Sequence, residues 1–176
     1  WQRAAWLVAH HHSLDAPWEL PWHVLKPLLA HEAIGELLEL VRANLLAHGR
    51  SLEPVEFCQR KLHEWPREFL DPPQLITGYD LIALGLEPGP IFKELLQRVR
   101  DAQLDGMIST REEALALVRR FLDFAALCFR QKRKTLRNNL AGRYPSARVD
   151  ALPEARRRAE ELPLEHLAEL YRRLAG

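Results

Sequence analysis

Hydrophobic side chains recur every three or four positions along most of this 176-residue chain, and this spacing limits the folds that it can adopt. Residues with that spacing lie on one face of an α-helix, which is buried when helices pack together. Alternating polar and apolar residues, or runs rich in valine and isoleucine, would predict strands, and such patterns are essentially missing. Glycines suited to ending a helix follow several segments: Gly49, Gly85, Gly106 and Gly142. The sequence therefore predicts an all-α fold.

The apolar pattern sets approximate bounds for the expected helices. They fall near residues 2–11, 22–30, 32–48, 53–63, 78–84, 90–104, 110–141, 153–161 and 164–174. The segment 65–73 contains several prolines and is expected to be a linker. We expect a helical bundle of two helical subdomains joined through one long helix.

The longest expected helix covers residues 110–141. Thr110 and Glu113 have the spacing of a capping box at its start, and no glycine or proline interrupts the sequence before Gly142. At 1.5 Å per residue, such a helix would be about 46 Å long. Within it, residues 121–129 place apolar groups around the helix axis and should be buried on most sides.

Composition narrows the class of protein. Hydrophobic residues make up 47% of the chain, enough for a core, and the net charge of +1 makes any strongly basic segment a local feature. Cys58 and Cys128 are too few for a disulfide framework, so we expect reduced, buried thiols in a cytoplasmic protein. No apolar run reaches the about 18 residues of a membrane span. Because the chain opens without Met, and its first residue, Trp1, stands at what looks like the middle of a helix, we expect a C-terminal fragment of a longer product.

One segment, FRQKRKTLRNNL at 129–140, is strongly basic and contains no carboxylate. On a helix, positions 130, 133, 134 and 137 would share one face. Guanidinium and ammonium groups bind phosphate, so this basic helix at 129–143 predicts RNA as a partner. We expect cations on phosphates and amides on sugar or base edges: Arg130, Lys132, Arg133, Lys134, Arg137, Asn138, Asn139 and Arg143. A solvated charged face is the other interpretation.

The residues from Phe121 onward resemble a known RNA-modifying family. QKRKTLRNNL is similar to the QRRKTLRNNL motif in the C-terminal helical domain of bacterial rRNA adenine dimethyltransferases, with Lys132 in place of the usual arginine. Residues 155–165 resemble the same family's R-A-E-E-L-S-L-E-E segment, with Pro163 in place of serine. That family's catalytic domain requires a glycine-rich turn and an Asn-Leu-Pro-Tyr-like motif, and neither is in this sequence. We therefore expect no methylation and no cofactor.

Residues 75–118 resemble a different family. LITGYDLIALGLEPGPIFK is similar to the ITG-x-DLI-x-LG-x-x-PGP-x-F-K hallmark of the C-terminal region of bacterial tRNA nucleotidyltransferase/poly(A) polymerase proteins. The resemblance extends more loosely over residues 1–73. It implies a parent enzyme that acts on RNA 3′ ends, and the chain should comprise three parts: 1–73, 74–120 and 121–176.

The turn in this motif is a possible second RNA contact. A helix that begins after Pro88-Gly89-Pro90 exposes unpaired N–H groups, and with Lys93 nearby they are suited to a phosphate at Gly89 and Lys93. A connector without a ligand is an equally good interpretation.

Three consecutive histidines, His10 to His12, raise the question of a metal site. In the nucleotidyltransferase family this region is related to HD phosphohydrolases, and the resemblance places Asn44 where a metal-ligating aspartate would stand. An amide is a poorer ligand than a carboxylate for a hard cation, and the remaining HD ligands are missing from the sequence. Adjacent helical residues also diverge by about 100°. We expect no metal.

Two classes of function remain after these comparisons of residues. The first is a noncatalytic RNA-binding module for tRNA or rRNA, with contacts to N-terminal catalytic domains of a parent nucleotidyltransferase or dimethyltransferase and with no membrane. The second is a structural or protein-interaction scaffold whose basic helix meets an acidic protein. Residual catalysis is a third interpretation, and the missing nucleotidyltransferase carboxylate pair and other catalytic motifs argue against it.

Overall fold

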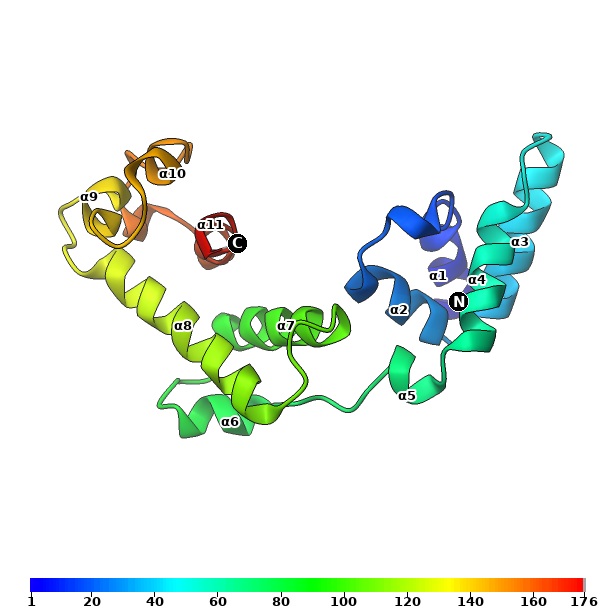
Figure 1. Ribbon diagram of the computed structural model, residues 1–176, viewed down its shortest axis with the longest axis horizontal. Helices are drawn as coiled ribbons and strands as arrows, with labels where there is room; N and C mark the ends of the chain where they lie inside the picture. The colour runs from blue at the N-terminus through cyan, green and yellow to red at the C-terminus, as the bar shows by residue number, and fades with distance from the viewer. Residues whose placement is uncertain (176) are drawn as a thin grey trace. The chain divides into compact units, whose positions relative to one another are not determined.

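The computed structural model describes residues 1–175 and shows a helical protein without strands in that range (Figure 1). Over the same residues, β-type pairing is limited to an isolated bridge between Ala141 and Tyr144. The all-α prediction is confirmed. None of the described helices combines the length and the hydrophobicity that crossing a bilayer requires.

The helices follow one another with short connections. The α-helices are α1 Gln2–His10, α2 Trp22–Ala30, α3 Ile34–Ala47, α4 Glu53–Glu64, α5 Arg67–Leu70, α6 Gly78–Ala83, α7 Pro90–Leu104, α8 Arg111–Phe129, α9 Leu136–Leu140, α10 Ser146–Asp150 and α11 Leu164–Ala175. The 3₁₀ helices are η1 Pro17–Glu19 and η2 Ala159–Glu161. Most predicted helices match these bounds closely, and the four glycines predicted to end helices all have positive φ, between 64° and 84°.

Two helix predictions are wrong. The helix expected over 110–141 ends at Phe129, and residues 153–161 form turns and η2 in place of an α-helix. The second error has a tertiary cause. The carbonyls of Ala155 and Arg157 accept hydrogen bonds from the backbone of α9, at 2.9 and 2.8 Å, so they are not available to a local helix.

The chain forms two compact units. The first contains residues 1–74 and 100–108, and the second contains residues 75–99 and those from Ser109 onward. The boundary passes through α7, whose residues up to Val99 pack in the second unit. The segments 74–120 and 121–176, predicted to resemble different families, both contribute to the second unit, and residues 100–108 of the former belong to the first. The family origin of each segment stays a prediction.

Apolar faces of α2, α3 and α4 form the core of the first unit. Its fully buried side chains include Leu25, Leu37, Val55 and Cys58. Burial raises the pKa of the Cys58 thiol to about 12, and the Cys128 thiol in the second unit behaves in the same way. Both cysteines are free, so the prediction of buried thiols is confirmed.

A buried lysine fixes the end of α7 within the first unit. Lys26 is 5% exposed, and its Nζ donates to the Leu104 carbonyl at 2.7 Å and lies 3.9 Å from the centre of the Phe69 ring. Burial is the main cause of the lowered pKa of this ammonium. Beside it, Asp105 lies 2.8 Å from the backbone N and 2.7 Å from Nδ1 of His23. The last turn of α7 thereby gains the partners that helix ends need.

Aromatic rings hold the second unit together. Phe124 is 2% exposed and lies against Tyr144 and Tyr171, with ring centres 6.0 and 5.2 Å away, and Phe121 contacts Tyr171 at 5.7 Å. Tyr171 belongs to α11, so α8 and α11 are packed through these rings. The prediction that residues 121–129 are buried holds for Phe121 and Phe124, but it is wrong for Phe129, which is 43% exposed.

The capping box predicted at the start of α8 is confirmed. The backbone N–H of Glu113 donates to Thr110 Oγ1 at 3.2 Å, and the Glu113 carboxylate accepts from the backbone N–H groups of Thr110 and Ser109 at 3.1 and 2.7 Å. The bonds from Ser109 and Thr110 lower the pKa of Glu113. The start of α8 is therefore defined by local sequence.

A second carboxylate fixes the start of α6 against α8. Asp80 accepts the backbone N–H of Thr77 at 2.7 Å and the Arg111 guanidinium at 2.6 Å. These two partners, Thr77 first, lower the pKa of Asp80.

We expect acidification to weaken both helix starts. Because the folded-state pKa values of Asp80 and Glu113 are lowered, each carboxylate stabilises the fold above its ordinary pKa, and this stabilisation is lost as the pH falls through the lowered pKa. Urea unfolding measured from neutral pH down to about pH 3 should show the loss. The variant Asp80→Asn with Glu113→Gln should depend less on pH than the wild type, and an equal dependence would contradict this account.

Candidate nucleic-acid interface

The basic segment forms a loop between two helices. α8 ends at Phe129, residues 130–135 turn, and α9 begins at Leu136, as Figure 1 shows at the far end of α8. The predicted basic helix over 129–143 is therefore wrong, and its four cations do not share one helical face. Two physical causes act together: the clustered cations repel one another at helical spacing, and a buried amide ends α8 from another part of the chain.

That amide is Asn139, which is 1% exposed. Its Nδ2 donates to the carbonyl of Cys128 at 2.7 Å and to the carbonyl of Gln131 at 3.2 Å. The Cys128 carbonyl belongs to the last turn of α8, where carbonyls have no partner within the helix, and Gln131 lies in the loop that follows. Asn139 thus closes α8 and shapes the loop. Because its side chain is buried, Asn139 is a weaker candidate for RNA than the exposed Asn138, and its role on sugar or base edges stays a prediction.

Arg137 is also occupied within the fold. Its Nε and one terminal nitrogen contact the two oxygens of the Asp150 carboxylate, at 2.5 and 3.2 Å. The hydrogen bond to Asp150 raises the pKa of Arg137. This bidentate pair connects α9 to α10, so Arg137 is a weaker candidate for phosphate than the sequence suggested.

The other predicted cations are exposed. Four of them, Arg130, Lys132, Arg133 and Lys134, lie in the loop. Neither these four nor Arg143 has a carboxylate within ion-pair distance among the side chains that the structure describes. The sequence from 124 to 149 contains no aspartate or glutamate. Asn138 is exposed as well. The loop is therefore a surface with uncompensated positive charge.

A further cation, Arg156, was not found by sequence reasoning. The backbone bonds from Leu136 and Arg137 to the carbonyls of Arg157 and Ala155 place residues 155–157 beside α9. Arg156 is exposed and has no carboxylate partner in the described part of the chain, whereas Arg157 is 3.8 Å from Glu161. The three consecutive arginines were a visible signal, but their position beside the loop depends on tertiary contacts.

The predicted second contact lies elsewhere in the second unit. Gly89 and Lys93 are exposed at the start of α7, where Phe92 packs against Gly78 at the start of α6. α6 in turn meets the first turn of α8 through Asp80 and Arg111. The length of α8, about 28 Å, separates this region from the basic loop. The structure does not bring the two predicted contacts together.

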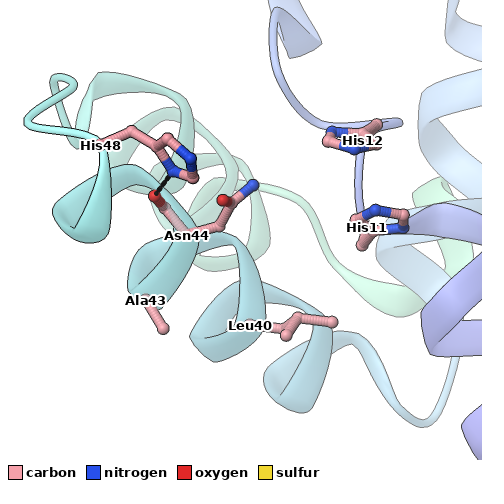
Figure 2. A pocket seen from close by; sticks show the side chains of 6 residues that line it. All are labelled: His11, His12, Leu40, Ala43, Asn44 and His48. Atoms are coloured by element: carbon pink, nitrogen blue, oxygen red, sulfur yellow. Dashed lines mark hydrogen bonds between the residues drawn. The ribbon is translucent and has the colours of Figure 1, made fainter.

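Three histidines of the first unit, His11, His12 and His48, line a depression (Figure 2). His11 and His12, from the turn after α1, lie opposite Asn44 of α3 and His48, the residue that follows α3. Nδ1 of His48 lies 2.8 Å from the Asn44 carbonyl, and Nδ1 of His11 lies 2.6 Å from the Val8 carbonyl. His10 instead packs beside Trp6. Among the described residues, no group of three metal-binding side chains is arranged around a common point.

Comparison with known proteins connects part of the chain to one enzyme class. The chain is 36% identical over 85 residues to the A-adding tRNA nucleotidyltransferase of Halalkalibacterium halodurans, covering 48% of this chain and 18% of that protein. It is 42% identical over 50 residues to the A-adding tRNA nucleotidyltransferase of Geobacter sulfurreducens, covering 28% of this chain and 6% of that protein. The chain thus spans less than a fifth of the length of either relative.

No protein-family model matches the chain, and no solved structure matches it. The dimethyltransferase resemblance of residues 121–176 stays a prediction. The resemblance to tRNA nucleotidyltransferases is confirmed in part, so this chain is, over about half of its length, similar to the A-adding members of that family.

Proposed function

We propose that the second unit is a noncatalytic RNA-binding module of a larger RNA-processing or RNA-modifying protein related to the tRNA nucleotidyltransferases. The observation that carries this proposal is the basic loop at 130–134, whose four cations are exposed and lack carboxylate partners among the described residues. Arg143 and Arg156 add charge from neighbouring segments. The relatives are named for their action on tRNA, which makes tRNA the first RNA to test.

The loop fits a phosphate backbone for electrostatic reasons. Each cation that neutralises a phosphate releases a condensed counterion, and this release dominates protein–RNA affinity at low salt. Lysine and arginine side chains that are already paired with carboxylates give up part of that gain, as Arg137 does with Asp150. The loop cations, which have no carboxylate partner among the described residues, keep the full free-energy gain from counterion release. Recognition should therefore depend on RNA shape and phosphate positions more than on bases.

Titration of the protein against a tRNA and a short rRNA hairpin tests the proposal. Fluorescence anisotropy at several salt concentrations should give micromolar or tighter binding, and log Kd should rise with log salt with a slope of about 4 if four loop cations each neutralise a phosphate. Heparin serves as the competitor. A specific RNA site should bind one of the two RNAs even in the presence of heparin. If heparin displaces both RNAs equally well, or if the protein binds neither RNA at low salt, the proposal is contradicted.

A further inference from the structure

Phe129 is an exposed aromatic ring at the edge of the basic loop. It is the last residue of α8, is 43% exposed, and immediately precedes Arg130. Within residues 1–175 its ring makes no contact with another aromatic ring or with a cation. The other two phenylalanines of α8, Phe121 and Phe124, are buried. The ring of Phe129 therefore contributes much less to the hydrophobic core than the rings of Phe121 and Phe124.

The backbone on each side of this ring is held in place. Asn139 Nδ2 bonds the carbonyl of Cys128, the residue before Phe129, and the carbonyl of Gln131, two residues after it. Asn139 is itself buried under the loop. The direction of the Cα–Cβ bond of Phe129 is therefore fixed by the fold. The residue directly precedes the loop that contains the cations.

A fixed ring beside unpaired cations is a known arrangement for unpaired nucleotides. A base can stack on the ring while the phosphates on either side of it meet cations, and such stacking is tolerant of base identity. In a paired stem the bases are already stacked on one another and are not available to the ring. An aromatic ring next to cations can therefore bind an unpaired base, which cations alone cannot do by stacking.

We propose that Phe129 is a stacking platform for one unpaired RNA base, whose flanking phosphates lie on the loop cations. The inference rests on the proposed RNA-binding function and adds to it a preference for RNA with an unpaired nucleotide next to a stem. An acidic protein segment would also be attracted to the cations, but it would have no need of an aromatic ring at this position. The effect of removing the ring therefore distinguishes an RNA partner from an acidic protein partner.

Two RNA probes test the inference. One is a hairpin with a fully paired stem, and the other is the same hairpin with a short unpaired extension that carries a fluorescent adenine analogue. Phe129→Ala should weaken binding of the extended probe by about 5- to 150-fold, the measured range for loss of one stacked base. Binding of the paired hairpin should be nearly unchanged. Quenching of the analogue on binding should be lost in the same variant.

Two matched variants separate stacking from simple apolar contact. Phe129→Tyr keeps the ring and should retain both affinity and quenching, whereas Phe129→Leu keeps apolar volume and should lose quenching as Phe129→Ala does. An equal loss on both probes would overturn the inference, because the ring would then only support the loop. Unchanged binding of the extended probe by Phe129→Ala would overturn it as well. If wild type binds neither probe, the proposed function itself fails, and this inference fails with it.

Discussion

Arg133→Glu combined with Lys134→Glu should abolish measurable RNA binding while leaving the unfolding temperature close to that of the wild type. Both side chains are exposed, and neither has a carboxylate partner among the described residues, so the exchange removes no ion pair from the fold. Each reversal deletes one phosphate contact and adds repulsion. We expect a loss on the order of 100-fold or more at low salt, and a salt slope lower by about 2.

The chain offers a matched control for this variant. Arg119 and Arg120 are also adjacent exposed cations of the second unit, on α8 and outside the loop. Arg119→Glu with Arg120→Glu changes the net charge by the same amount, and it should weaken binding far less. Equal losses of RNA affinity in the two double variants would show that total charge is responsible and that the loop is not the binding site. Arg137 is a poor choice for reversal, because a glutamate there would face Asp150.

Phe124→Ala should destabilise the second unit by about 3–5 kcal/mol. The ring is 2% exposed and lies between Tyr144 and Tyr171, so its removal leaves a cavity between α8 and the segments that follow it. Urea or guanidinium unfolding followed by circular dichroism measures the change. Phe129→Ala is the control on the same helix, and it should cost less than about 1 kcal/mol because the ring is exposed. A loss at position 124 as small as this would argue against the packing of α8 on Tyr171.

Local signals in the sequence predicted the helices whose ends are determined locally. Thr110 and Glu113 lie three residues apart, and the structure shows the capping box that this spacing predicts. Gly85 and Gly106 end helices with positive φ for the same reason: the preference belongs to the residue itself. Such helix ends depend on residues that are close in the sequence, so the sequence alone is enough to predict them.

The end of α8 could not be predicted in this way, because its cause lies in another element. Neither glycine nor proline marks Phe129, and Asn139 reaches its carbonyl partners from α9. The pairing of Arg137 with Asp150 and the approach of Arg156 to the loop have the same origin. A basic segment thus identified the candidate surface, while the residues available on that surface depended on tertiary contacts.

Asn139 also determines which substitutions the basic segment can accept. At the exposed loop positions, lysine and arginine both keep the positive charge and disturb no contact of the fold, as with Lys132 where the resembling motif has arginine. Position 139 has no such freedom. Aspartate would face two carbonyl oxygens with a negative charge, leucine has no donor, and glutamine adds a methylene where the side chain is 1% exposed. The position in this segment with the strictest side-chain requirement is thus a buried one, where the side chain serves the fold.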